Sequence, residues 1–135
     1  MVTAVDTSVL LDVVSGDPRW ADGSEAALRQ ASREGSLVIC ECVLAELVPA
    51  VGADAIEEFL ADLEIRLTPS SRSSAILAGR MFALHLARGG KGGRVVPDFL
   101  IGAHAKLHAE RLLARDRGYV RDYFKKVVLW DPSHK

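Results

Sequence analysis

The chain has 135 residues, of which 49% are hydrophobic and 26% are charged. This composition excludes a disordered or fibrous protein, and we expect residues 1–135 to form a single globular domain with its own core. The formal net charge of −1, from 17 Lys and Arg against 18 Asp and Glu, excludes a strongly basic nucleic-acid module. Any contact with RNA or DNA must therefore use a local surface.

Short apolar blocks alternate along the chain with longer segments in which apolar residues recur at helical spacing. The blocks are too short for helices and are bounded by glycine, proline or polar residues, which is typical of buried strands. The predicted strands are residues 2–5, 37–40, 65–67, 111–114 and 127–129. The predicted helices are residues 9–14, 20–33, 43–48, 54–63, 70–87, 99–109 and 117–124.

This alternation predicts an α/β fold, a three-layer α/β/α sandwich with a mainly parallel central sheet. Parallel strands need crossover connections, which place helices on both faces of the sheet. Pro49 is expected to end the third helix, because proline has no amide hydrogen to continue it. The segment RGGKGGR at residues 88–94 is too rich in glycine for regular structure and predicts a mobile loop.

The cellular compartment is predicted from cysteine usage and from the apolar runs. Cys40 and Cys42 are too few and too close together for a disulfide framework, and we expect both to pack as small buried groups. No apolar run approaches membrane-spanning length, and the N-terminus lacks the basic segment of a secretory signal. A cytoplasmic protein without membrane contact is expected.

Four carboxylates fall where a predicted strand ends or a helix begins: Asp6, Glu46, Asp98 and Asp116. The carboxyl ends of parallel strands meet at one edge of a sheet, where α/β folds place their ligands. Two like charges about 4 Å apart repel by roughly 4 kcal/mol at an effective dielectric near 20, so clustered acids need a cation. Oxygen ligands without Cys or His suit Mg²⁺ or Mn²⁺.

Such a metal site indicates hydrolysis of phosphodiester bonds, because the cation activates water and stabilises charge on phosphate oxygens. A purely local explanation also exists, since Asp is favoured at turns and helix caps. Glu46 distinguishes the two explanations best. It lies among apolar residues within a predicted helix, where no capping role accounts for it.

Several polar residues could bind substrate. The hydroxyls of Thr7 and Ser8 could position phosphate or a water on the metal, although capping the next helix is their commoner use. Arg88, Lys91 and Arg94 of the glycine-rich segment could clamp an RNA backbone, or could simply be solvated. GGKGG is no Walker motif, because it lacks the GK[ST] that opens a helix.

Other ionisable residues are expected to lie outside the metal site. His104 and His108 share one helix with Asp98 but point away from it, which favours surface or core-edge roles. Arg115 and Arg117 flank Asp116, and the sequence leaves open whether they contact substrate or pair with nearby acids. Helix-face or turn positions are expected for Asp12, Asp122 and Asp131.

Five ordered blocks span nearly the whole chain: AVDTSVLLDVV, CVLAEL, RVVPDFLIGAHA, LLARDRGYVRDYF and VVLWDP. In this order the chain resembles a PIN-domain ribonuclease, specifically the VapC-type toxins of bacterial VapBC toxin–antitoxin pairs. The resemblance implies a Mg²⁺- or Mn²⁺-dependent endoribonuclease acting on an RNA such as tRNA or rRNA. It also implies a homodimer, a cognate VapB-type antitoxin, and an acidic quartet at Asp6, Glu46, Asp98 and Asp116 that serves as both metal and catalytic site.

One position departs from the family pattern. Many relatives carry Thr or Ser two residues before the fourth acid, where this chain has Ala114. Loss of that hydroxyl would remove a hydrogen bond to a metal ligand and weaken the hold on the ion. A catalytically silent PIN-like module that only binds RNA or an antitoxin is therefore an alternative.

Two other classes fit less well. A phosphatase that forms an aspartyl phosphate needs a second Asp two residues after the first, and that position is Ser8. A phospho-receiver module needs paired N-terminal acids and a Lys at a strand end, and no Lys follows the LLA or VVL blocks.

Overall fold

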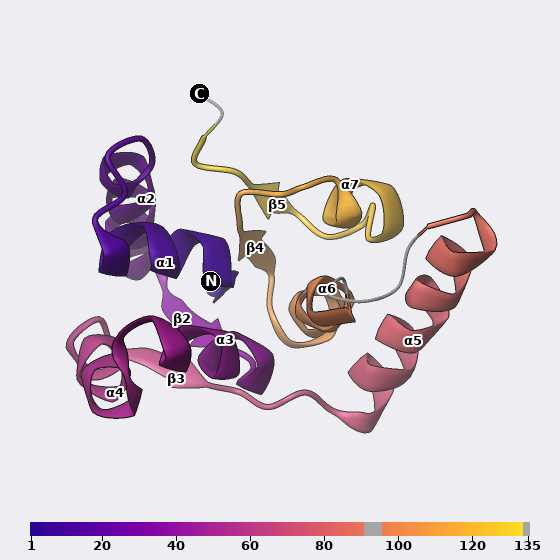
Figure 1. Cartoon of the computed structure of the whole chain (residues 1–135), viewed down its shortest axis with the longest axis horizontal. Coiled ribbons are helices and arrows are strands. Elements are labelled where there is room, and N and C mark those ends of the chain that lie inside the picture. The colour runs from indigo at the N-terminus through magenta and orange to yellow at the C-terminus, as the bar shows by residue number, and fades with distance from the viewer. Residues whose placement is uncertain (91–95, 134–135) are drawn as a thin grey trace.

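A computed structural model describes residues 1–90 and 96–133. Its strands form one sheet in the order β3-β2-β1-β4-β5, and every pair of neighbouring strands is parallel (Figure 1). The predicted three-layer α/β fold is confirmed, with a sheet that is wholly parallel in the described residues. Lys91 and Arg94, two predicted phosphate contacts, lie outside these residues.

The strands are β1 Val2–Val5, β2 Ser36–Ile39, β3 Ile65–Leu67, β4 Arg111–Leu113 and β5 Leu129–Trp130. The helices are α1 Thr7–Ser15, α2 Ala21–Glu34, α3 Glu41–Val51, α4 Ala53–Asp62, α5 Arg72–Ala87, α6 Val96–His108 and α7 Tyr119–Tyr123. No helix within these residues is both long and apolar enough to cross a membrane.

The core lies on both faces of the central strands. Val5 and Leu113 are paired neighbours in β1 and β4, with exposures of 1% and 0%. Helix α6 packs on β1 and β4 from one side and carries the fully buried Phe99, whereas α1 and α2 lie on the other side (Figure 1). Each large apolar side chain buried in this way contributes about 1.5–3 kcal/mol, so the sheet is a rigid support for the loops at its ends.

The expected end of the third helix is wrong. Helix α3 continues past Pro49 to Val51 and ends at Gly52, whose φ of +92° is unfavourable for other residues. Proline keeps a φ close to the helical value, so a short segment beyond it can stay helical although one hydrogen bond is lost. Glu46 is therefore held in the middle of a regular helix.

Helix α6 begins earlier than predicted. It starts at Val96, so that Pro97 and Asp98 both belong to its first turn. Proline is tolerated there because the first amide groups of a helix have no intrahelical acceptor. A carboxylate in the first turn also interacts favourably with the helix dipole, which stabilises Asp98 at this position.

Candidate active site at the carboxyl edge of the sheet

A pocket of about 310 Å³ opens beside the carboxyl ends of β1 and β4. It is lined by Asp6, Thr7, Ser8, Leu11, Glu46, Asp98, Ile101, Leu112, Ala114, Arg115, Asp116, Arg117, Tyr119 and Val120. All four carboxylates singled out from the sequence are in this set. The pocket thus gathers acids from the end of β1, from α3, from α6 and from the segment after β4.

Asp6 directly follows β1 and caps helix α1. Its Oδ2 accepts hydrogen bonds from the Ser8 amide at 3.1 Å and the Ser8 hydroxyl at 2.5 Å. The expectation that a hydroxyl of Thr7 or Ser8 caps this helix is therefore wrong, because the Asp6 carboxylate takes that role. Ser8 instead fixes the orientation of Asp6.

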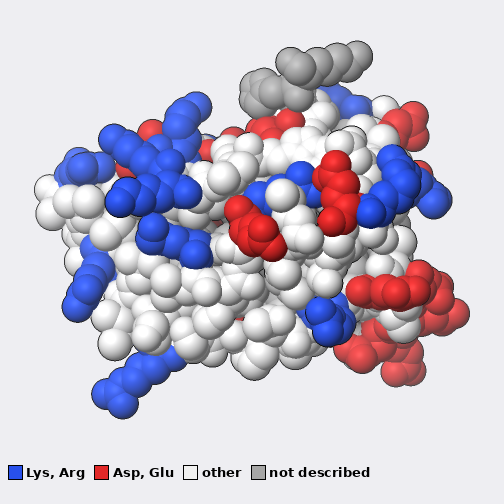
Figure 2. All heavy atoms as spheres, turned by 180° about the vertical axis from the view of Figure 1, so that it is seen from behind, with Lys and Arg blue, Asp and Glu red and all other residues white. Residues whose placement is uncertain are grey.

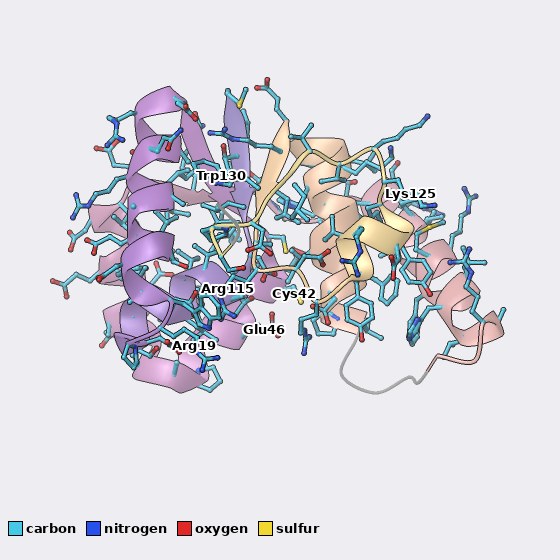
Figure 3. The ribbon with its side chains drawn as sticks, turned by 90° about the horizontal axis from the view of Figure 1, so that it is seen from above. Arg19, Cys42, Glu46, Arg115, Lys125 and Trp130 are labelled. Carbon is cyan, nitrogen blue, oxygen red and sulfur yellow. The ribbon has the colours of Figure 1, made fainter. Side chains whose placement is uncertain are left out.

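Thr7 connects Glu46 to the same turn. The Thr7 hydroxyl donates to Oε1 of Glu46 at 2.7 Å, and Thr7 itself is buried. Glu46 is exposed, so this hydrogen bond is what holds its flexible side chain at the pocket wall. Figure 3 shows Glu46 close to Arg115, and both residues line the pocket.

Asp98 and Asp116 have protein partners of their own. Oδ2 of Asp98 accepts from the Arg117 guanidinium at 2.8 Å. The carboxylate of Asp116 accepts from the amides of Val120 and Arg121, each at 3.1 Å, which anchors it to the start of α7. The Arg117 side chain is 70% exposed, so the Asp98 ion pair is open to exchange with solvent or a ligand.

The pKa values of Asp6 and Asp98 are both raised, in part by the negative charges of neighbouring acids. Burial raises the pKa of Asp6, the hydrogen bonds from Ser8 oppose this rise, and the charge of Glu46 adds to it. Burial also raises the pKa of Asp98 to about 6, against the lowering effect of Arg117 and with further raising by Asp6 and Glu46. The mutual repulsion expected from the sequence is therefore present for these acids.

The donor set fits a hard divalent cation in its chemistry, because the pocket offers carboxylate oxygens and, among the residues that the structure describes, no thiol or imidazole lines it. The side chains are nevertheless spread around the wall. Across residues 1–90 and 96–133, no three His, Cys, Asp or Glu side chains come together closely enough to hold one ion. Each carboxylate is held by a protein donor instead, and the role of the four acids as metal ligands stays a prediction.

The remaining predicted residues fall in different places. Arg88 does not line the pocket, and its guanidinium lies 5.3 Å from the centre of the Tyr123 ring. His104 is only 1% exposed and its Nε2 lies 2.7 Å from the Thr68 carbonyl oxygen, so the prediction of a surface or core-edge role is wrong for this residue. Burial lowers the pKa of His104, which keeps the imidazole neutral within the core.

The two cysteines separate in the fold. Cys40 is 1% exposed, as expected, whereas Cys42 is half-buried near the pocket. Burial raises the pKa of Cys42 to about 12, and the nearby Glu46 and Asp98 contribute to this rise. The thiol therefore stays protonated and is a poor metal ligand.

Sequence reasoning missed the role of Asp12. Asp12 lies within helix α1, one of the two kinds of position expected for it, but it is 3% exposed and both of its carboxylate oxygens accept hydrogen bonds from Arg115. The signal was its place in the run VLLDVV, four residues after Ser8 and thus on the same side of α1. Both arginines that flank Asp116 pair with acids in this structure, Arg115 with Asp12 and Arg117 with Asp98.

Comparisons with known proteins agree with this architecture. The PIN domain model matches residues 3–125, and no curated protein matches the chain. The fold is similar to VapBC2 from Rickettsia felis bound to a DNA fragment from their promoter, with 19% identity over 97% of this chain and 98% of that one and a TM-score of 0.70. It is also similar to FitAcB from Neisseria gonorrhoeae, with 20% identity over 98% and 99% of the two chains and a TM-score of 0.71.

A third similar structure is VapBC-1 from nontypeable Haemophilus influenzae, with 17% identity over 98% of this chain and 99% of that one and a TM-score of 0.70. At these identities the structural likeness establishes the fold alone. The family model covers most of the chain, including the carboxylates Asp6, Glu46, Asp98 and Asp116. The chain therefore belongs to the PIN-domain family.

Proposed function

We propose that the chain is a Mg²⁺- or Mn²⁺-dependent endoribonuclease of the VapC type, the toxin of a type II toxin–antitoxin pair. PIN domains are generally nucleases, which supports a hydrolase, and they typically use divalent metals. The observation that carries the proposal is the convergence on one pocket of four acids that lie far apart in the sequence, Asp6, Glu46, Asp98 and Asp116.

These four carboxylates would hold the cation. When bound, a divalent cation acidifies water and stabilises negative charge on phosphate oxygens. Ser8 and Thr7 would keep Asp6 and Glu46 oriented through the hydrogen bonds at 2.5 Å and 2.7 Å. A metal shared by Asp6 and Asp98 would also relieve the repulsion that raises both of their pKa values.

Arg117 is suited to contact the substrate. Arg117 lines the pocket, its side chain is 70% exposed, and its guanidinium pairs with the Asp98 carboxylate that the cation would take and lies 5.9 Å from the centre of the Tyr119 ring. A guanidinium freed from Asp98 could pair with a phosphate oxygen of the RNA through charge-assisted hydrogen bonds. Arg88, Lys91 and Arg94 stay candidates for contacts farther along the backbone, although Arg88 itself lies outside the pocket.

The surface supports a local attraction for RNA despite the near-neutral net charge. Figure 2 shows acidic side chains gathered at the lower right, on the side of α4, and basic side chains concentrated on the left, on the side of α5 and α7. Helix α4 carries Asp54, Glu57, Glu58 and Asp62. Separated charge of this kind can orient an RNA chain toward one side of the protein.

Partners follow from the type of toxin. Several structures of similar fold are VapBC complexes, which supports a VapB-type antitoxin as a partner. A homodimeric toxin is proposed with it. No membrane partner is proposed.

The test is an RNA cleavage assay with purified protein. Structured RNA such as tRNA or rRNA should be cut with Mg²⁺ or Mn²⁺, and a chelator or Asp6→Asn should abolish cutting. Glu64→Gln is the matched control, because Glu64 lines a different cavity at the amino end of the sheet. Cleavage by Asp6→Asn at the wild-type rate would reject the assigned site.

The alternative is a silent PIN-like module that binds RNA or an antitoxin without cutting. Ala114 favours it, because this wall of the pocket presents a methyl group rather than a hydroxyl. RNA binding and antitoxin binding without cleavage at any concentration of Mg²⁺ or Mn²⁺ would support that alternative.

A further inference from the structure

At the pocket wall, Arg115 forms an ion pair with the buried Asp12. Nε and Nη2 of Arg115 donate to the two carboxylate oxygens of Asp12 at 2.8 Å and 2.7 Å. The Ser24 hydroxyl donates to Asp12 Oδ2 at 2.7 Å, and the Arg115 guanidinium lies 5.0 Å from the centre of the Trp20 ring. The Asp12 carboxylate is therefore held by Arg115 and Ser24, and the Arg115 guanidinium is held by Asp12 and by the Trp20 ring.

This geometry is more than a surface contact. Asp12 is 3% exposed, and a carboxylate so deeply buried is stable only when it is paired and hydrogen-bonded. The planar guanidinium matches the carboxylate with two parallel bonds, which restricts the Arg115 side chain to one orientation. Helix α1 and the segment after β4 are thereby joined at a fixed distance.

The pair is connected to both acids at the strand ends. The Arg115 amide donates to Ser8 Oγ at 3.1 Å, and Ser8 Oγ donates in turn to Asp6 Oδ2 at 2.5 Å. Asp116 is the next residue after Arg115. By fixing Arg115, the ion pair therefore constrains the positions of both Asp6 and Asp116.

We propose that Asp12 and Arg115 are positioning residues that hold the Asp6 and Asp116 segments in register for cation binding. The proposal makes two claims. The first is that the ion pair fixes the backbone positions of Ser8 and Asp116. The second is that this increases the affinity for the cation, and it rests on the proposed metal-dependent activity. Partners that orient metal ligands without touching the metal typically change its affinity by about 10–100-fold.

Arg111, the first residue of β4, provides a matched control. It pairs with Glu34, its guanidinium lies 4.7 Å from the centre of the Trp130 ring, and its Nε donates to Thr3 Oγ1 at 2.8 Å. The interactions are of the same kinds as those of Arg115. Arg111, however, is at the amino end of β4 and does not line the pocket.

The experiment compares Arg115→Met with Arg111→Met. Mn²⁺ affinity is measured by calorimetry at a temperature at which circular dichroism shows each variant folded. Arg115→Met should bind Mn²⁺ at least about tenfold more weakly than the wild type, and Arg111→Met should stay within about twofold. Equal loss in both variants, or none in Arg115→Met, overturns the proposal.

Arg115→Met leaves the buried Asp12 charge unpaired, which can prevent folding. A double variant is therefore tested as well. Asp12→Asn with Arg115→Met removes both charges and should restore folding, since replacing both partners of a buried pair costs little. The double variant should still bind Mn²⁺ at least about tenfold more weakly than the wild type. Wild-type affinity in this variant would contradict the positioning role.

The claim that the ion pair fixes the backbone of these segments is tested in the absence of metal. Backbone amide NMR signals of Asp6 and Ser8, which lie far from position 115 in the sequence, should shift in Arg115→Met and stay unchanged in Arg111→Met. Absence of these shifts overturns the inference whatever the metal data show. A wild-type protein that binds no Mn²⁺ but shows the expected shifts would instead reject the proposed function and keep the structural coupling.

Discussion

The two ends of strand β4 use the same kind of interaction in different surroundings. At the amino end, Arg111 pairs with Glu34, whose side chain is 41% exposed. At the carboxyl end, Arg115 pairs with Asp12, whose side chain is 3% exposed. Water can solvate the exposed Glu34 carboxylate, so that pair contributes less, whereas the buried Asp12 carboxylate is costly to leave without its partner.

The cavities at the two ends of the sheet differ in size and in the number of acids that line them. The amino end has the larger hollow, about 580 Å³, with one acid, Glu64, in its lining. The smaller pocket at the carboxyl end holds four acids and is lined by Arg115, which pairs with the buried Asp12. Size alone therefore does not identify a site, and the gathering of charge beside a rigid support is the better indicator.

The largest expected effect is on RNA cleavage. Asp6→Asn should reduce cleavage by about 10³-fold, equivalent to about 4 kcal/mol of transition-state stabilisation, because a proposed metal ligand becomes neutral. Glu64→Gln at the opposite end should leave the rate unchanged. Single-turnover assays on a structured RNA measure both, and equal rates for the two variants would remove the functional contrast between the ends.

The next effect is on stability. Arg115→Met should lower the free energy of unfolding by about 3 kcal/mol, because the buried Asp12 carboxylate loses its counter-charge. Arg111→Met should cost clearly less, since Glu34 can be solvated. Urea denaturation compares them directly, and similar losses would mean that burial does not distinguish the two pairs.

The pH dependence of stability should have opposite signs at the two ends. The pKa of Asp98 is raised from 3.8 to about 6, so its stabilising contribution is present below pH 3.8 and is lost as the pH rises through about 6. Hydrogen bonding to Arg111 lowers the pKa of Glu34 from 4.5, so its contribution is present above pH 4.5 and lost on acidification.

Urea denaturation between pH 3 and 7 without metal checks these signs. Asp98→Asn should reduce the loss of stability on raising the pH, and Glu34→Gln should reduce the loss on lowering it. Mg²⁺ added at pH 7 should stabilise the wild type more than Asp98→Asn. The idea of a strained acidic pocket fails if Asp98→Asn is less stable than the wild type at pH 7 in chelator.

The smallest effect concerns Ala114, which is 2% exposed in the pocket wall. Ala114→Ser restores a hydroxyl of the kind that many relatives carry and adds little volume. One added hydrogen bond of about 1 kcal/mol would raise Mn²⁺ affinity about fivefold. Calorimetry measures the change, and an unchanged affinity would show that the methyl group does not limit metal binding.

Much of this protein could be predicted from local patterns. Apolar blocks such as Leu37–Ile39 mark strands, and the alternation of strands with helices gives a parallel sheet. Glu46 stood out because no local role explains an acid within a mainly apolar helix. The family was also predictable, since the motifs around Asp6, Asp98 and Asp116 occur in a fixed order.

Element ends were less predictable, because they depend on contacts outside the segment. Helix α3 passes through Pro49, and β5 occupies Leu129–Trp130 rather than residues 127–129. The Ala114 amide donates to the Trp130 carbonyl at 3.0 Å, so pairing with β4 decides where β5 lies. A strand at the edge of a sheet has no independent signal for its register.

By itself, the sequence determined the α/β architecture, the PIN-domain family and the four acids, because periodicity and motif order are properties of local segments. Only the tertiary structure decided what each charge is paired with. Asp12 reaches Arg115 across 103 positions of the chain, and Thr7 reaches Glu46 across 39. Such pairs depend on burial and distance in the folded molecule, which no local pattern encodes.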